Sequence, residues 1–343
     1  MEPVILVRFR PSGPWRIGPD SGARHQVDRI YHSDTLFSAV CHAMERLGLL
    51  SEWLAATVEN PQGPAARFSS CFPFLDDLLF VVPPRTLWPP AASPKVRWKS
   101  ARFVPLSLVT ALLADAPLNE DGWIVDGPSQ CLLPLERRFR FGPFGPVIRS
   151  RASVDRLSPQ VEVHSAACLE FAEGAGLWAI VGFADEQARE RWATPVQSAL
   201  RLLADTGLGG ERSLGWGHSA SPEFFGPPEA VFPSHDREGA GLSEGETAHW
   251  LLSLFAPAKD EVIDWQRGNY SILTRGGRVD SPVRSGEPKR LLRMVEEGSV
   301  LVSRAPLRGS APNVAPDGFP HPVYRAGYPL AIPIALRPTE VRP

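Results

Sequence analysis

The sequence predicts an α+β protein in which helices cover one face of antiparallel sheets. Its 343 residues exceed one ordinary domain and favour two domains of about 150 residues each. A hydrophobic content of 43% is sufficient to build large cores. Strand–helix–strand units recur along the chain without the regular βαβα alternation that is typical of a parallel sheet.

The first half is expected to begin with a strand and a long helix. Ile5, Val7 and Phe9 alternate with their neighbours at a period of two, which predicts a strand with one apolar face. A helix is expected at about 34–48, where apolar residues recur at helical spacing. Ser33 is suited to cap the start of this helix.

The rest of the first domain is predicted to contain short elements and one basic loop. The segment near 67–82 predicts a strand. The segment near 101–110 predicts a strand or a short helix. The stretch 84–102 between them is rich in proline and carries five basic residues and no acid, so we expect a protruding basic loop. These segments complete a predicted N-terminal domain of residues 1–124.

The second domain is predicted for residues 125–343. Segments 169–171 and 177–183 are apolar and flank a glycine-containing turn, which predicts a hairpin. A helix is expected to start at Thr194, with proline at its first helical position, and to end at Gly207 in a left-handed cap.

The C-terminal remainder reads as mostly β-structure. The polar, glycine- and proline-rich stretch 226–247 predicts an insertion, and strands are expected near 270–274, 299–303 and 323–335. Two halves built in this way fit a pair of ferredoxin-like (RRM-like) domains with long loop insertions.

Composition excludes several classes of protein. No apolar run reaches the roughly 18 residues of a membrane span, and the N-terminus does not read as a signal peptide, so we expect a cytoplasmic protein with no membrane partner. The cysteines include no C-x-x-C pair and are expected to be buried free thiols. We therefore expect no metal site and no cofactor.

The basic residues are almost all arginine. Lysine accounts for only four of the 36 basic residues, although the net charge is −2. Stretches 84–102, 137–156 and 275–293 are cationic, and a planar guanidinium binds phosphate with two hydrogen bonds. A basic face for a polyanion is one interpretation. A GC-rich genome and ordinary solvated surface are the alternatives, and composition does not separate them.

Residues 207–217, GLGGERSLGWG, combine five glycines with one arginine and one tryptophan. Arg212 stands where a dinucleotide motif needs its third glycine, and the segment follows a predicted helix where that motif follows a strand. Trp216 and Gly217 replace the lysine and hydroxyl residue of a P-loop. The remaining interpretations are a loop that binds a phosphodiester chain and a tight turn with Trp216 in the core.

This run resembles the glycine-rich loop of RAMP proteins, the RRM-like RNA binders of CRISPR systems. Four other stretches are similar to subunit 4 of the type III-A (Csm) interference complex. They are YHSDTLFSA at 31–39, RSRASVDR at 149–156, MVEEGS at 294–299 and HPVYRAG at 321–327.

The resemblance implies two ferredoxin-like domains and a non-catalytic role in antiviral defence. Such subunits bind the 5′ repeat-derived tag of the guide RNA (crRNA). They also bridge the large polymerase/cyclase subunit to the backbone RAMP subunit. A protruding element separates tag from guide in such subunits, and the stretch 84–102 is our candidate for it.

The residues expected to contact RNA come from the glycine-rich loop, the start of the first helix and the basic segments. They are Gly207, Gly209, Gly210, Arg212, Ser213, Gly215, Trp216, Gly217, Asp34, Thr35, Lys95, Arg97, Lys99, Arg149, Arg151 and Arg156.

Three alternatives remain at this stage. A RAMP-type endoribonuclease that processes crRNA would need a general acid and base, and Tyr31, His25, His32 and His42 supply the residue types. The corresponding subunit of a type III-B complex is a second alternative. A protein-interaction subunit with incidental basic loops is the third.

Overall fold

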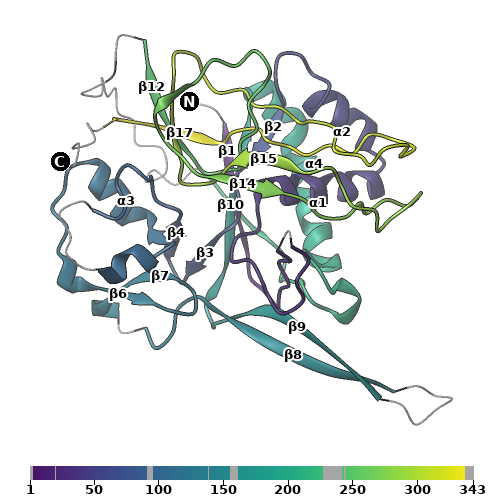
Figure 1. Ribbon diagram of the computed structural model, residues 1–343, viewed down its shortest axis with the longest axis horizontal. Coiled ribbons are helices and arrows are strands. Elements are labelled where there is room, and N and C mark those ends of the chain that lie inside the picture. Colours follow the sequence, from purple (N-terminus) through teal and green to yellow (C-terminus); the bar gives the residue numbers. More distant parts are fainter. Residues whose placement is uncertain are drawn as a thin grey trace.

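The computed structural model describes residues 3–19, 21–90, 96–137, 139–154, 161–226, 242 and 245–336. It is a mixed α/β fold with antiparallel sheets (Figure 1). Every pair of named strands runs antiparallel within the described part of the chain.

The largest sheet has seven strands. They are β1 (Val4–Phe9), β2 (Ala66–Phe68), β3 (Phe72–Leu75), β4 (Leu78–Val81), β5 (Val104–Pro105), β10 (Ala175–Phe183) and β11 (Glu223–Phe225). Their order is β11-β1-β10-β3-β4-β5, and β2 also pairs with β10. The sheet therefore takes strands from both sides of residue 124, so the two expected domains share one sheet.

Four α-helices accompany this sheet in the described residues: α1 (Ser33–Arg46), α2 (Leu50–Thr57), α3 (Leu106–Leu113) and α4 (Glu186–Thr206). Helices α1 and α4 pack against each other, and both contact β2. The helix predicted at 34–48 is confirmed. Ser33 is not its N-cap, because His32 occupies that position and the Ser33 hydroxyl accepts a hydrogen bond from the N–H of Leu254 at 3.0 Å.

Helix α4 is longer than predicted. It starts at Glu186, where the Asp185 side chain accepts a hydrogen bond from the N–H of Ala188 at 2.7 Å, so the predicted start at Thr194 is wrong. Pro195 lies inside the helix, although proline removes one backbone hydrogen bond there. The helix ends before Gly207, whose φ of +89° is positive but whose ψ of 140° lies outside the left-handed helical region.

The predicted pairing of 169–171 with 177–183 is also wrong. Strand β9 (Val161–Phe171) pairs with β8 (Phe144–Val154), and β10 pairs with β1, β2 and β3. Burial explains the difference, because β10 is buried along its whole length and β9 is exposed at its outer end. A strand that is apolar on both faces belongs in the centre of a sheet.

The C-terminal part adds two small sheets. Strands β12 (Thr247–Leu251), β13 (Asp264–Asn269), β16 (Val300–Ser303) and β17 (Ala331–Ile334) form one in the order β13-β16-β12-β17, and β14 (Ile272–Arg275) pairs with β15 (Leu292–Val295). The strands predicted near 270–274 and 299–303 are confirmed, whereas only the end of 323–335 is a strand. Most of the predicted insertion 226–247 lies outside the described residues.

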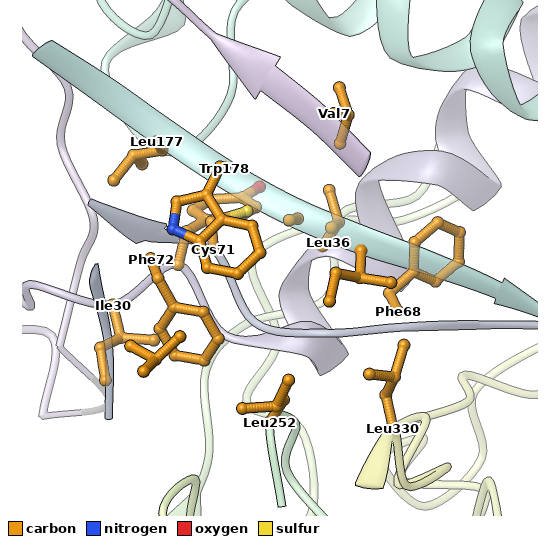
Figure 2. Packing of buried hydrophobic residues seen from close by; sticks show 14 of the residues in the cluster. Val7, Ile30, Leu36, Phe68, Cys71, Phe72, Leu177, Trp178, Leu252 and Leu330 are labelled. Carbon is orange, nitrogen blue, oxygen red and sulfur yellow. The ribbon is translucent and has the colours of Figure 1, made fainter. Parts of the chain in front are cut away.

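One cluster of buried apolar side chains joins these parts. It includes Val7, Leu36 and Trp178 from the large sheet and α1 as well as Leu252 and Leu330 of the C-terminal part (Figure 2). This packing explains why β1 is not one-sided as predicted: Leu6 is buried as well as Val7.

The stretch 84–102 packs onto the protein more closely than predicted. Leu87, Trp88 and Trp98 are buried, and the Trp88 indole N–H donates to the carbonyl of Ala101 at 3.2 Å. Prolines indicate a loop, but burial of these side chains holds its described part against the body. The element that projects from the molecule is the β8–β9 hairpin (Figure 1).

The smaller elements complete the described chain. They are β6 (Trp123–Asp126), β7 (Cys131–Pro134) and the 3-10 helices η1 (Val96–Ser100), η2 (Glu120–Gly122), η3 (Leu135–Arg137) and η4 (Arg212–Leu214). All four cysteines are free, and three of them are buried. Within the described residues, no helix has the length and apolar character to cross a membrane.

Candidate nucleic-acid interface

The β8–β9 hairpin has a fixed base and cationic flanks. At its base, the rings of Phe144 and Phe171 lie 5.8 Å apart, and Phe171 lies 6.2 Å from Trp15. Further along, the register places Arg149 opposite Ala166 and Arg151 opposite His164. The packed base holds these side chains at a defined distance from the body.

The glycine-rich loop 207–217 is closed by its own backbone. The N–H of Leu208 donates to the carbonyl of Gly217 at 3.0 Å, and the N–H of Gly217 donates to the carbonyl of Pro14 at 2.9 Å. The N–H of Gly210 donates to the carbonyl of Arg16 at 2.8 Å. These inner amides are therefore occupied, and the groups free to meet a ligand belong to the outer part, residues 211–216.

Gly217 is required for this closure. Its φ is +83°, and an added Cβ would lie 2.1 Å from the carbonyl oxygen of Leu208. We expect Gly217→Ala to lower the free energy of unfolding by about 2–5 kcal/mol, combining left-handed strain with overpacking. Gly215 is the matched control, because its φ is +79° but nothing lies within 4 Å of an added Cβ. Gly215→Ala should cost only about 1–2 kcal/mol in urea denaturation, and equal losses would contradict this account.

Arg16 fastens the loop to the hairpin. Its guanidinium is buried and donates from Nη1 to the carbonyls of Ala167 at 2.7 Å and Arg24 at 3.0 Å. Its own carbonyl accepts from Gly210 of the loop. Arg16 was not predicted as a site residue, because no local pattern distinguishes it from other arginines.

A pocket of about 260 Å³ lies between the glycine-rich loop and the hairpin, and we call it the hairpin–loop pocket. Its lining residues are Arg24, Arg149, Ser150, Arg151, His164, Ser165, Ala166, Glu211, Leu214 and Trp216. The structure thus brings together Arg149, Arg151 and Trp216, three residues predicted to contact RNA. Three further lining residues were not predicted. Arg24 and His164 come from segments without a motif, and Glu211 was overlooked within the glycine-rich loop.

The cations of this pocket are available to an anionic ligand. Arg149 pairs with Glu170 at 2.6 Å, and Arg151 lies 3.5 Å from Glu211, but both arginine side chains are about half exposed. Exposed ion pairs are worth about 0–1 kcal/mol, so phosphate can replace such a partner at little cost. Trp216 is half-buried and makes no ring pair with any described aromatic side chain, which leaves an indole face for a base.

The remaining loop residues lie around the pocket. Arg212 and Ser213 are exposed, and the Arg212 guanidinium lies 3.0 Å from the carboxylate of Asp280. Gly215 is also exposed. Gly207 and Gly209 lie underneath, where added Cβ atoms would meet the carbonyls of Trp216 and Arg16, respectively.

Asp34 and Thr35 do not face this pocket. Asp34 is buried, and its carboxylate accepts hydrogen bonds from Arg275 at 3.0 and 3.1 Å and from Arg325. Burial alone would raise the pKa of Asp34, but Arg275 and Arg325 outweigh it and hold that pKa well below its usual range. Asp34 therefore joins α1 to the C-terminal part of the protein, and the prediction that it positions RNA is wrong.

The other predicted contacts remain predictions. Lys95 and Arg156 lie outside the described residues, as does the side chain of Arg97. Lys99 is exposed on η1 and does not line the hairpin–loop pocket.

The candidate nuclease residues do not share a site. Tyr31 is buried, and burial raises its pKa. His32 is buried between Glu297 at 2.7 Å and Asp28 at 3.2 Å, whereas His25 and His42 line two separate pockets. Among the described residues, no group of three or more histidine, cysteine or acidic side chains is arranged to hold a metal ion.

Comparisons with known proteins agree with this architecture. Residues 244–334 match the family model of the CRISPR Csm4 C-terminal domain. No curated protein sequence matches the chain.

The fold is shared over nearly the whole chain with two solved structures. One is a chain of the crystal structure of the Csm3–Csm4 subcomplex in the type III-A CRISPR-Cas interference complex. The two chains are 17% identical, the match covers 96% of this chain and 99% of that chain, and the TM-score is 0.65. The other is a chain of the crystal structure of the Csm1–Csm4 cassette in complex with cA4. The two chains are 18% identical, the match covers 98% of this chain and 99% of that chain, and the TM-score is 0.58.

The family model covers the C-terminal strands β12 to β17, and the shared fold extends over the rest of the described chain. Residues 244–334 thus resemble the Csm4 C-terminal domain, and the chain as a whole has the fold of these chains from type III-A CRISPR complexes.

Proposed function

We propose that this chain is the subunit of a type III-A CRISPR effector complex that binds the 5′ repeat-derived tag of crRNA in antiviral defence. The observation that carries the proposal is the hairpin–loop pocket, where Arg149 and Arg151 from the hairpin meet Trp216 from the glycine-rich loop. Arginine side chains and an aromatic face together are the means by which proteins bind single-stranded RNA.

The proposed RNA path follows from the fold. Strands and helices in the order β1, α1, β2/β3, β10, α4 and β11 form a sheet ordered β11-β1-β10-β2/β3. This order supports a ferredoxin-like unit, and residues 78–171, with the β8–β9 hairpin, are then an insertion into it. We propose that the hairpin is the protruding element that separates tag from guide, in place of 84–102.

The proposed partners are the large polymerase/cyclase subunit and the backbone RAMP subunit. Chains with this fold occur in a Csm1–Csm4 cassette and in a Csm3–Csm4 subcomplex. We propose that this chain bridges the corresponding two subunits in its own complex.

The proposed role is binding without catalysis. A nuclease of the RAMP type needs an accessible acid and base, and burial of Tyr31 and His32 argues against that use. Incubating the purified chain with repeat RNA tests this part of the proposal, and defined cuts that His25→Ala or His42→Ala abolish would contradict it.

Affinity for tag-bearing crRNA tests the binding role. We expect Trp216→Ala to weaken binding by about 1–3 kcal/mol, or roughly 5- to 150-fold, through loss of base stacking. Replacing Arg149 and Arg151 together by alanine should weaken binding and lower the slope of log K against log salt by about 1–2. Fluorescence anisotropy at several salt concentrations measures both effects.

Arg189→Ala is the matched control for the charge change. Arg189 lies on α4, is half exposed and pairs with Glu186 at 2.6 Å, as the pocket arginines pair with acids, but it does not line the pocket. This variant should keep both the affinity and the salt slope. Unchanged affinity for the Trp216 and Arg149/Arg151 variants in the assembled complex would refute the proposed function.

A further inference from the structure

Glu211 is the acidic residue in an otherwise cationic pocket. The lining of the hairpin–loop pocket includes Arg24, Arg149 and Arg151, which attract phosphate, whereas a carboxylate repels it. The Glu211 side chain is only 22% exposed, and its Oε2 lies 3.5 Å from Nη2 of Arg151. An ionised carboxylate is solely an acceptor of hydrogen bonds, so this part of the wall suits a ligand with N–H donors.

The backbone at Glu211 is unusual for this residue type. Its φ of 59° and ψ of 27° lie in the left-handed region, which costs a non-glycine residue conformational energy. The residue before it is Gly210, and Gly215 and Gly217 follow, so the loop uses glycine freely at other positions. Strain of this kind is concentrated where a side chain is used, which indicates that the Glu211 carboxylate has a role in the pocket.

Trp216 supplies the second requirement of a base-binding site. Its indole lines the same pocket as Glu211, and the loop between them is the single turn η4 (Arg212–Leu214). An unstacked base binds proteins through an aromatic face and through hydrogen bonds to its Watson–Crick edge. The pocket thus combines a stacking surface with an acceptor and, in Arg151, a neighbouring donor.

Building on the proposed RNA binding, we propose that the hairpin–loop pocket holds one unstacked guanine whose Watson–Crick edge is read by Glu211. Guanine is the one RNA base with two adjacent N–H donors, N1–H and the N2 amino group, and the two carboxylate oxygens of Glu211 accept both. The guanidinium of Arg151 donates to O6 on the same edge. On the same edge, adenine and cytosine each have one donor group, an amino group, and uracil has one, N3–H. None of these three bases can therefore offer two adjacent donors to the carboxylate.

Inosine tests the proposal at one functional group, because it is guanosine without the N2 amino group. The probes are single-stranded uridine octamers with one guanosine at each position in turn, and the matching set with inosine. We expect the full-length wild-type chain to bind at least one guanosine octamer about tenfold more tightly than its inosine counterpart. Glu211→Gln has only one acceptor oxygen and should bind the two octamers equally.

Glu170→Gln is the matched control. It removes an acid of the β8–β9 hairpin that, like Glu211, pairs with an arginine but does not line the pocket, so it should keep the preference for guanosine. Equal wild-type affinity for guanosine and inosine octamers, or a preference retained in Glu211→Gln, overturns the role of Glu211 and leaves the RNA-binding function standing. Failure of the wild-type chain to bind any octamer or tag-bearing crRNA overturns both.

Discussion

Replacing Asp34 by asparagine is expected to lower the free energy of unfolding by about 3–5 kcal/mol. The Asp34 carboxylate is buried between the guanidinium groups of Arg275 and Arg325, which are themselves buried. Asparagine is close in shape but carries no charge, so both buried guanidinium groups would lose the negative charge that Asp34 places between them. Urea denaturation of the full chain, with unchanged folded-state circular dichroism, measures the loss.

Asp280→Asn is the control for this prediction. Asp280 also pairs with an arginine, Arg212 at 3.0 Å, but the aspartate is 61% exposed and the arginine 46%. Water screens such a pair, so its loss should change stability by no more than about 1 kcal/mol. Similar losses in the two variants would show that burial is not what makes the Asp34 pair important.

The Asp34 pair belongs to a larger joint between the two ends of the chain. Next to it, His32 contacts Glu297 and Asp28, and the hydroxyl of Ser70 also donates to Glu297. Three of the stretches that carry the family resemblance therefore meet here: 31–39 supplies His32 and Asp34, 294–299 supplies Glu297, and 321–327 supplies Arg325. These three stretches therefore hold the two ends of the chain together.

Local signals predicted the local parts of the structure. Helix α1 was found because its apolar periodicity is strong, and the glycine-rich loop because its glycines, Arg212 and Trp216 are adjacent in the sequence. Strand pairing was not found in the same way. Strand β1 pairs with β10, about 170 residues later, and no turn or spacing signal connects them.

The residues of the pocket were likewise predictable only where they are close together in the sequence. Trp216 and Glu211 lie within one motif, whereas Arg24 and His164 come from distant segments. The Arg16 guanidinium holds the backbone of Arg24 beside the pocket, and the β8–β9 register places His164 opposite Arg151. Asp34 shows the opposite error, since a helix start suggested contact with phosphate. Its burial depends on Arg275 and Arg325, which are more than 240 residues away in the sequence.

His32 is expected to make stability depend on pH on the alkaline side. Burial alone would lower its pKa, but the carboxylates of Glu297 and Asp28 outweigh burial and raise the pKa from 6.5 to about 9. A raised pKa in the folded state means that the contribution of His32 is complete below about pH 6.5 and is lost as pH rises through about 9. The loss approaches about 1.4 kcal/mol per pH unit within that window.

His32→Gln isolates this effect. The variant should be less stable than wild type at pH 6.5, because Glu297 loses its charged partner, and the difference should shrink as pH rises towards 9 and above. Urea denaturation of both proteins between pH 6 and pH 10 measures the difference. His249→Gln is the control, since burial lowers the pKa of His249 to about 4 and the ring stays neutral throughout this range. Its difference from wild type should stay constant with pH, and a constant difference for His32→Gln would mean that the buried imidazole carries no charge.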